Sequence, residues 1–170
     1  MLGDLSRGMV MEARHRVKDD LRFEYFMADI QSIPLPEHAF DRVVANHMFY
    51  HVPDIDRGIS EMARILAPGG LAMAATNGPH TMRELYALIR EIAPHYEMPP
   101  AGAAARFSLE NGPVYFEKCF SRVWVEQYED SLWVTEAQPD WKAVPATSYW
   151  ICFNGESRAM VAFILASRAA

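Results

Sequence analysis

The sequence predicts a layered α/β domain, with helices on both faces of a mainly parallel sheet and an antiparallel hairpin near the C-terminus. Short runs of β-branched and aromatic residues alternate with segments of helical periodicity, as in parallel sheets joined by helical crossovers. The chain has 170 residues, of which 51% are hydrophobic and 22% are charged. This length and composition are typical of one globular domain with a buried core. We therefore expect residues 1–170 to form a single domain.

The first half of the chain contains alternating helical and strand-like segments. Ser6 and Asp54 each precede an apolar stripe of helical spacing, as helix-capping residues do. Between and after these stripes lie short apolar runs without helical periodicity. The predicted elements are a helix from Ser6 to Val17, strands at Phe23–Ile30, Arg42–Asn46 and Leu71–Thr76, and a helix from Asp54 through Leu66 that Pro68–Gly70 ends.

The second half begins with a helix and ends with a hairpin. Thr81 and Glu84 have the spacing of a capping box, and Pro94 would end the helix that they open. Asn154-Gly155 is a strong turn signal between two strand-like runs. The remaining predicted elements are a short helix from Pro113 to Phe120, strands at Val123–Tyr128 and Leu132–Thr135, and the two hairpin strands Tyr149–Phe153 and Met160–Ala166.

The composition argues against several kinds of partner. The formal net charge is -6, so an acidic surface would repel a nucleic-acid backbone. No apolar run approaches the roughly 18 residues of a membrane span, and the N-terminus lacks a signal-peptide pattern. Two cysteines, Cys119 and Cys152, are too few for a disulfide scaffold. We therefore expect a cytoplasmic protein that binds neither nucleic acid nor membranes.

Three polar residues follow predicted strands and are candidate ligand-binding groups. They are Asp4, Asp29 and Asn46. Ligands of open α/β sheets bind at the carboxyl ends of the strands, where one carboxylate can accept hydrogen bonds from a ribose diol and another from an adenine amino group. In the alternative interpretation, Asp4 only caps the first helix and Asp29 only opens a turn. These residues alone leave both interpretations open.

The order of several segments favours the ligand-binding interpretation of these residues. The chain resembles the class I S-adenosylmethionine-dependent methyltransferases, particularly the small-molecule branch that includes enzymes of quinone biosynthesis. The resemblance covers about residues 1–77. It rests on the segments DLSRGM at 4–9, ADI at 28–30, IPLPEHAFD at 33–41, ANHMFYHVPD at 45–54 and EMARILAPGG at 61–70.

This resemblance implies a fold, a reaction and a binding site. The fold is a Rossmann-like three-layer α/β/α sandwich, and the reaction is methyl transfer from S-adenosylmethionine to an O, N or C atom of a small-molecule acceptor. S-adenosylhomocysteine is the cofactor product. The implied cofactor-binding residues are Asp4 at the ribose with Leu5 and Met9 beside it, Asp29 at the adenine amino group, Ile30 at the adenine ring, and Asn46 and His47 near the methionine part.

Two histidines are candidate general bases. Methyl transfer requires in-line positioning and, for some acceptors, removal of a proton. His47 and His51 lie in the segment that the resemblance places beside the acceptor, and histidine titrates near neutral pH. Alternatively, both rings serve a structural role. The four-residue spacing of the pair could suggest a metal site, but no third ligand stands nearby, and we expect no metal.

The chain departs from the family at its N-terminus. The family begins with a central strand and a glycine-rich loop that binds the methionine end of the cofactor, and residues 1–170 contain no counterpart of either. We therefore expect an N-terminally truncated, incomplete domain. Its neighbouring strands would leave a gap or pair directly, with open edges that favour a homodimer. Loss of three hydrogen bonds from the loop would cost about 3 kcal/mol of cofactor affinity.

Two other functions fit the same residues. The chain could be a non-catalytic remnant of a methyltransferase that acts as a binding or oligomerisation module. It could also be another nucleotide-binding enzyme, such as a dehydrogenase, because those enzymes likewise place an acidic residue after the second strand. The Pro68-Gly69-Gly70 segment and the terminal hairpin favour the methyltransferase arrangement.

Overall fold

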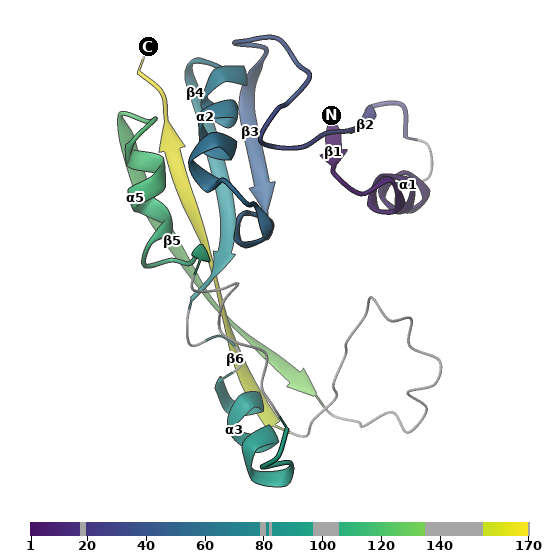
Figure 1. Cartoon of the computed structure of the whole chain (residues 1–170), viewed down its shortest axis with the longest axis vertical. Coiled ribbons are helices and arrows are strands. Elements are labelled where there is room, and N and C mark those ends of the chain that lie inside the picture. The colour runs from purple at the N-terminus through teal and green to yellow at the C-terminus, as the bar shows by residue number, and fades with distance from the viewer. Residues whose placement is uncertain (18–19, 79–80, 82, 97–105, 135–154, 170) are drawn as a thin grey trace.

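The computed structural model divides the chain into two β-sheets that do not pair with each other. It describes residues 1–17, 20–78, 81, 83–96, 106–134 and 155–169. The first sheet has the order β1-β2, and the second has the order β3-β4-β6-β5 (Figure 1). We refer to residues 1–36 as the N-terminal unit and to the described residues from 37 onward as the main unit.

The N-terminal unit is a small parallel β-α-β arrangement. Strand β1 (Leu2–Asp4) pairs with β2 (Tyr25–Met27), and helix α1 (Arg7–Arg16) lies between them in the sequence. As predicted, Ser6 caps α1, because its hydroxyl accepts a hydrogen bond from the Met9 amide at 3.4 Å. No residue of α1 is buried. The strand β2 is shorter than the predicted run.

The main unit contains the larger sheet. Strands β3 (Phe40–Asn46) and β4 (Leu66–Asn77) pair in parallel. Strand β6 (Gly155–Ser167) pairs antiparallel with β4 on one side and with β5 (Arg122–Val134) on the other. The predicted mainly parallel beginning and antiparallel end of the α/β fold are therefore confirmed.

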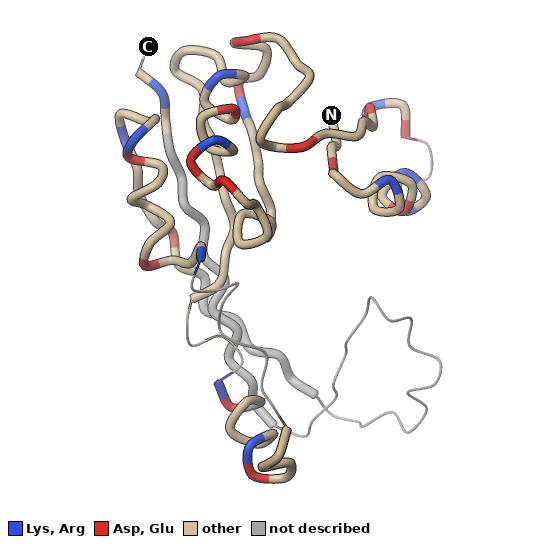
Figure 2. Tube along the Cα trace, viewed as in Figure 1, with Lys and Arg blue, Asp and Glu red and all other residues tan. Residues whose placement is uncertain are grey.

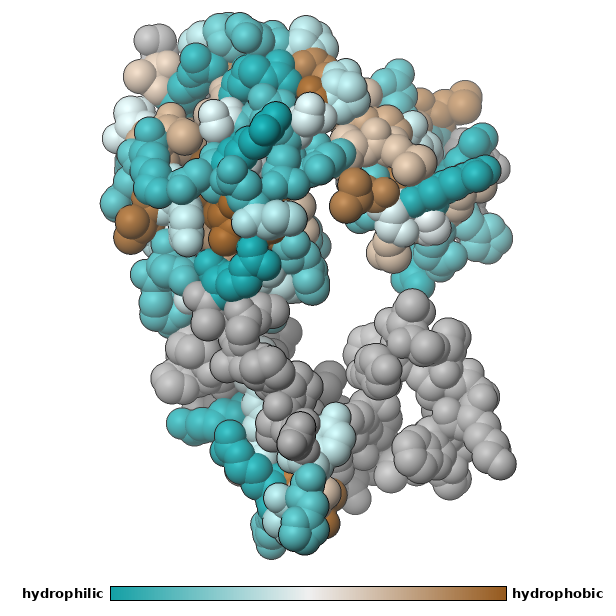
Figure 3. All heavy atoms as spheres, in the orientation of Figure 1, coloured by the Kyte–Doolittle hydropathy of each residue, from teal (hydrophilic) through white to brown (hydrophobic). Residues whose placement is uncertain are grey.

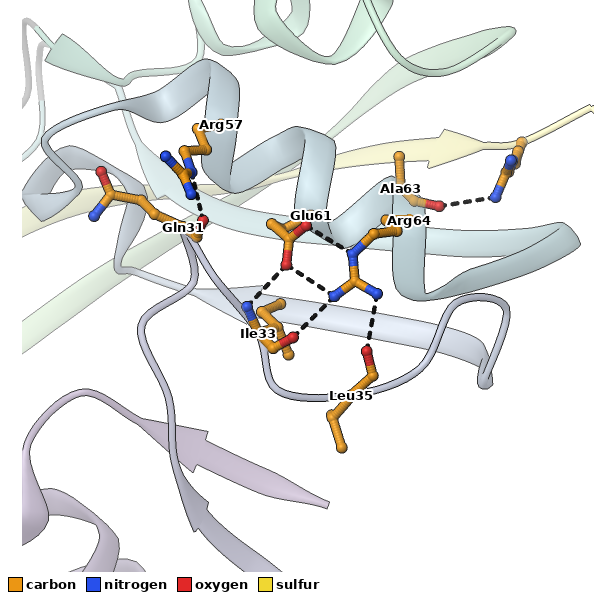
Figure 4. Close-up of polar contacts among 8 residues, drawn as sticks. Gln31, Ile33, Leu35, Arg57, Glu61, Ala63 and Arg64 are labelled. Atoms are coloured by element: carbon orange, nitrogen blue, oxygen red, sulfur yellow. Dashed lines mark hydrogen bonds and ion pairs between the residues drawn. The ribbon is translucent and has the colours of Figure 1, made fainter.

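The sequence allowed either a gap or direct pairing where the family's first strand would stand. The structure shows the gap. Neither β1 nor β2 pairs with β3, so β1 and β3 each have a partner strand on one edge only, among the residues that the structure describes. Figures 1 and 4 show β1 and β3 running in the same direction on either side of this interval.

The hydrophobic core lies where two helices pack on the larger sheet. Helix α2 (Ile55–Ile65) and helix α5 (Gly112–Glu117) both contribute to one buried cluster with the inward residues of β3 and β4. Three phenylalanine rings lie at its centre, and the centroids of Phe49 and Phe107 are 5.0 Å apart. The fully buried side chains include Phe49, Phe107, Phe116, Ile59, Met62 and Leu66.

The end of α2 differs from the prediction. The helix ends at Ile65, and Leu66 already begins β4, which continues through Pro68, Gly69 and Gly70. Gly69 has φ +74°, a left-handed conformation that glycine adopts without strain. The proline and glycines therefore shape the start of the strand. They do not terminate the helix.

The C-terminal hairpin also differs in detail. The sequence predicted a break at Glu129-Asp130-Ser131, but β5 is continuous across these residues. Strand β6 pairs with β5 on one edge, with Val134 opposite Gly155. The strand predicted at Tyr149–Phe153 and the turn residue Asn154 lie outside the described residues. Charged residues inside a strand are tolerated where the long-range partner supplies a full ladder of hydrogen bonds.

Smaller elements complete the described fold. A 3₁₀ turn, η1 (Phe49–His51), joins β3 to α2, and α3 (Arg83–Ile92) follows β4. Asp54 caps α2 as predicted, accepting from the Arg57 amide at 3.0 Å. Figure 2 shows charged residues on the helices, in the loops and at the start of β3, while β4 carries none. Among the described helices, none combines the length and apolar character needed to cross a membrane.

Candidate functional site

The ends of β1 and β2 bring two of the predicted site residues to the same edge of the small sheet. Asp4 ends β1, and its carbonyl accepts a hydrogen bond from the Ala28 amide at 3.1 Å. Asp29 follows Ala28 directly. Because the two strands are parallel, both aspartates lie at carboxyl ends, as ligand-binding residues of α/β sheets do.

The Asp4 carboxylate helps to start α1. Its Oδ1 accepts a hydrogen bond from the Ser6 amide at 2.7 Å and so orders the turn before α1, whose N-cap residue is Ser6 itself. The side chain is exposed, and within the described part of the chain no hydrogen bond reaches Oδ2. One carboxylate oxygen therefore orders the turn, while the other can accept hydrogen bonds from a ligand.

Asp29 forms a tight turn with Gln31. Its Oδ1 accepts from the Gln31 amide at 2.9 Å and from the Gln31 side chain at 3.0 Å. The backbone hydrogen bond, followed by the side-chain one, lowers the pKa of Asp29, and these bonds favour the ionised carboxylate. Asp29 thus opens a turn, and its carboxylate keeps its negative charge at neutral pH.

Gln31 connects this turn to α2. Its side-chain oxygen accepts from the Asp54 amide at 3.0 Å, and its carbonyl accepts from Arg57 Nε at 2.7 Å. The turn that carries Asp29 is therefore attached to the first turn of α2. That helix start follows the segment in which His47 and His51 lie.

A second contact between the loop and α2 is the Glu61–Arg64 clamp, by which we mean these two side chains and the backbone groups that they bind (Figure 4). Glu61 Oε2 accepts from the Ile33 amide at 2.8 Å. Arg64 donates to the carbonyls of Ile33 at 2.8 Å and Leu35 at 2.9 Å, and its Nε lies 2.7 Å from Glu61 Oε1. Arg64 lowers the pKa of Glu61, so the pair stays ionised at neutral pH.

Glu61 and Arg64 lie in the segment 61–70, which contributed to the resemblance, but the sequence predicted no function for either residue. The signal was present, because residues three apart on a helix lie on one face and can form an ion pair. Their loop partners could not be deduced, because these partners are about thirty residues away and are backbone groups.

The three apolar site residues of the N-terminal unit and its loop lie in two environments. Leu5 and Met9 are 69% and 57% exposed. Ile30 packs against the core, and its Cγ2 lies 3.3 Å from the position that a Cβ on Gly58 would occupy. The absence of a side chain at Gly58 therefore lets the loop approach α2 closely. Ile30 anchors the Asp29 turn, whereas Leu5 and Met9 are accessible to a ligand.

Asn46 and His47 occupy the carboxyl end of β3. The side chain of Asn46 is exposed, and the amide of His47 donates to the Ala75 carbonyl at 3.0 Å. His47 has φ 50°, the left-handed region that non-glycine residues rarely adopt and that often marks functional sites. Burial lowers the pKa of its imidazole, so the ring is neutral at pH 7 and can accept a proton.

His51 lies in η1, closer to solvent. Its ring contacts that of Tyr50, with centroids 4.5 Å apart and an interplanar angle of 63°. Burial raises the pKa of the Tyr50 phenol, which is therefore neutral at pH 7. In the part of the chain that the structure describes, no group of three or more histidine, cysteine or acidic residues could hold a metal ion.

Comparison with known sequences places the chain near methyltransferases. The profile of a family described as "Methyltransferase domain" matches residues 2–74. Malonyl-acyl-carrier-protein O-methyltransferase of Methylovorus sp. is 32% identical over 136 residues, which are 71% of this chain and 46% of that protein. Methyltransferase GfsG of Streptomyces halstedii is 39% identical over 75 residues, 42% of this chain and 27% of that protein. The chain thus spans about half or less of these relatives.

Solved structures superpose on this chain over nearly its whole length. The YcgJ protein of Bacillus subtilis superposes with a TM-score of 0.61 at 14% identity, covering 99% of this chain and 82% of that one. A SAM-dependent methyltransferase of Thermotoga maritima superposes with a TM-score of 0.58 at 18% identity, covering 98% and 72%. At these identities the likeness concerns the fold. Both neighbours contain residues that have no counterpart in this chain.

Proposed function

We propose that this chain, which belongs to the class I S-adenosylmethionine-dependent methyltransferases, binds S-adenosylmethionine at the carboxyl ends of β1, β2 and β3 and supports methyl transfer to a small-molecule acceptor. One observation carries the proposal. The exposed carboxylate of Asp4 and the ionised carboxylate of Asp29 follow neighbouring parallel strands of the small sheet. His47, whose backbone is left-handed, follows β3. The proposed location is the cytoplasm, because two cysteines are too few for a disulfide scaffold.

Each part of the cofactor has a candidate partner. Asp4 would accept hydrogen bonds from the ribose hydroxyls through the oxygen that the helix cap does not use. Asp29 would accept from the adenine amino group, beside the backbone of Ile30. The exposed side chains of Leu5 and Met9 would cover the apolar parts of the nucleoside. Asn46 and His47 would lie near the methionine end. These residue types fit the cofactor, which supplies an electrophilic methyl group on a sulfonium.

The protein's contribution to the reaction is position and, for O–H or N–H acceptors, a base. With the cofactor bound, the methyl group would pass from the sulfonium sulfur to the acceptor atom, and the proton of an O–H or N–H acceptor would go to this base. His47 is the first candidate base, because burial keeps its ring neutral at pH 7 and a neutral ring can accept the proton. His51 is the second candidate, and its exposed ring could pass the proton to solvent.

Calorimetry with S-adenosylhomocysteine tests the cofactor site. Asp4→Asn and Asp29→Asn keep an acceptor for the Ser6 and Gln31 amides, so both turns should persist while the ribose and adenine contacts weaken. We expect each variant to bind about tenfold more weakly than the parent. Asp41→Ala is the matched control, an exposed aspartate near the opposite end of β3. The proposal fails if the parent shows no saturable heat, or if all three variants bind equally.

A further inference from the structure

Gln31, in the loop between β2 and β3, uses every polar atom that it has in a hydrogen bond within the protein. Its backbone amide donates to Asp29 Oδ1 at 2.9 Å, and its side-chain nitrogen donates to Oδ1 at 3.0 Å and to Oδ2 at 3.1 Å. Its side-chain oxygen accepts from the Asp54 amide at 3.0 Å, and its carbonyl accepts from Arg57 Nε at 2.7 Å (Figure 4). The residue is only half-buried, so water could have filled these places. This set of protein partners indicates a specific role.

The two ends of the Gln31 carboxamide have opposite partners, and this fixes its orientation. The nitrogen faces the Asp29 carboxylate, which when ionised only accepts hydrogen bonds. The oxygen faces the Asp54 amide, which only donates. Rotation of the carboxamide by half a turn would place oxygen against oxygen and N–H against N–H. Gln31 therefore holds the Asp29 carboxylate in one orientation relative to the Asp54 amide.

The contacts from Gln31 leave the Asp29 carboxylate little room for ligand hydrogen bonds. A carboxylate oxygen accepts about two hydrogen bonds. Oδ1 of Asp29 already accepts from the amide and the side chain of Gln31, whereas Oδ2 accepts only from the side chain among the described residues. One position on Oδ2 is therefore open. Asp29 is thus oriented for a single N–H donor, which is what an adenine amino group would direct at it.

The same carboxamide connects Asp29 to the N-terminus of α2. Asp54 caps that helix by accepting from the Arg57 amide at 3.0 Å, and the Arg57 side chain returns to the Gln31 carbonyl. Gln31, Asp54 and Arg57 thus form a closed ring of hydrogen bonds. Figure 3 shows the two units in contact above an open space, and this ring joins one residue of the N-terminal unit to two residues of the main unit. The main unit therefore sets the orientation of Asp29.

We propose that Gln31 is a positioning residue of the candidate cofactor site, which orients the Asp29 carboxylate for one ligand N–H by holding it against the N-terminus of α2. The proposal rests on the proposed function for the identity of the ligand, whereas the contacts themselves belong to the protein. Gln31 acts through Asp29 and need not touch the cofactor. Without the carboxamide, the backbone amide of residue 31 still bonds to Oδ1, so the turn should persist while the carboxylate loses its fixed orientation.

Gln31→Glu gives the most specific test. At pH 8 the new carboxylate would face the Asp29 carboxylate, and two like charges in contact repel each other. At lower pH the pair would share a proton, and a protonated glutamic acid donates and accepts at the same places as glutamine. By calorimetry, we expect S-adenosylhomocysteine to bind this variant at least about tenfold more weakly than the parent at pH 8 and within about threefold of the parent at pH 5.5.

Other ionisable groups near the turn are the same in parent and variant. On α2, its cap and the segment before it, these groups are Asp54, Arg57, Glu61, Arg64, His47 and His51. The histidines titrate between pH 5.5 and pH 8, and the parent reports their effect on binding. The ratio of the two dissociation constants at each pH therefore isolates the pair at positions 29 and 31.

A neutral pair of variants tests the hydrogen bonds without a new charge. Gln31→Met keeps the length of the side chain and removes its donor and its acceptor. Ser32→Ala is the matched control, because Ser32 is an exposed residue of the same turn. At pH 7 we expect Gln31→Met to bind S-adenosylhomocysteine about tenfold more weakly than the parent, and Ser32→Ala to bind like the parent.

A titration without ligand separates this proposal from the proposed function. NMR of the Asp29 side-chain carbonyl carbon follows its ionisation in each protein. Because the side-chain hydrogen bond from Gln31 favours the ionised carboxylate, Gln31→Met should raise the pKa of Asp29, and Ser32→Ala should leave it unchanged. If the parent does not bind S-adenosylhomocysteine, the proposed function fails, and this titration still decides whether Gln31 holds Asp29.

Three results would overturn the proposal. These are equal affinity of Gln31→Met and the parent, a weakened affinity of Gln31→Glu that does not recover at pH 5.5, and an unchanged pKa of Asp29 in Gln31→Met. Recovery of Gln31→Glu at low pH supports the proposal even if Gln31→Met does not fold, because a misfolded chain would not regain binding when a single proton is added.

Discussion

The N-terminal unit and the main unit are built from similar sequence patterns but differ in burial. Each has a parallel strand pair and a helix whose start is capped by a hydrogen-bonding side chain. Helix α2 buries five residues against its sheet, whereas α1 buries none. Both units therefore have a capped helix and a parallel strand pair, although the cap of α1 is longer, at 3.4 Å against 3.0 Å. Among the residues that the structure describes, β1 has a partner strand on one edge only.

The two units are joined by the loop at residues 28–36. This loop is held to α2 by Gln31, Arg57 and the Glu61–Arg64 clamp, with Ile30 inserted toward Gly58. No strand pairing connects the units within the described residues. The comparison indicates that the position of Asp4 and Asp29 relative to His47 depends on these side-chain contacts.

Core truncation should show the largest difference between the units. The ring of Phe49 is fully buried among Phe107 and Phe116, so Phe49→Ala leaves a cavity and should lower the free energy of unfolding by about 3–5 kcal/mol. Phe26 of the N-terminal unit is only half-buried, and Phe26→Ala should cost about 1–2 kcal/mol. Urea denaturation measures both, and equal losses would show that the two units are equally well packed.

Removal of one ion pair from each unit tests the same difference in burial through the Tm. Arg64→Ala leaves the Ile33 and Leu35 carbonyls and the Glu61 carboxylate without their donor and should lower the Tm by several degrees. Arg16→Ala in α1 breaks an exposed pair with Glu12 and should leave the Tm nearly unchanged. Arg64→Lys keeps the charge but cannot bind both carbonyls and the carboxylate. Its Tm should therefore lie between that of the parent and that of Arg64→Ala. A Tm of Arg64→Ala equal to that of Arg16→Ala would contradict the assigned clamp.

The confirmed predictions concern contacts between residues that are close in the sequence. The caps Ser6 and Asp54 act on amides three residues away, so the chain itself encodes them. The predictions that failed concerned distant partners. Strand β5 continues through Glu129-Asp130-Ser131 because β6 pairs along its whole length, and neither that pairing nor the clamp contacts can be deduced from neighbouring residues. The assignments of His47 and His51 as bases stay predictions.

The pH dependence of stability should reveal the state of His47. Burial lowers its folded-state pKa below the ordinary histidine value of 6.5, so the unfolded chain binds the proton more readily. Stability should therefore be constant above about pH 7.5, fall as the pH drops through 6.5, and stop falling below the folded-state pKa. His47→Gln should remove this slope. Urea midpoints between pH 8 and pH 5.5 give the measurement; an unchanged slope in the variant would assign the dependence to another group.

The smallest stability effect is expected at the exposed apolar residues of the N-terminal unit. Leu5 is 69% exposed, so Leu5→Ser should change the free energy of unfolding by less than about 0.5 kcal/mol. If Leu5 covers the nucleoside, as proposed, the same substitution should weaken S-adenosylhomocysteine binding about threefold to tenfold, since it removes apolar contact area. Leu21→Ser is the control, because Leu21 is 98% exposed and is not among the proposed site residues. Equal affinity of the two variants would remove Leu5 from the site. A loss of stability in Leu5→Ser would instead mean that this residue packs against the protein itself, and the difference between the units would then be smaller than the structure indicates.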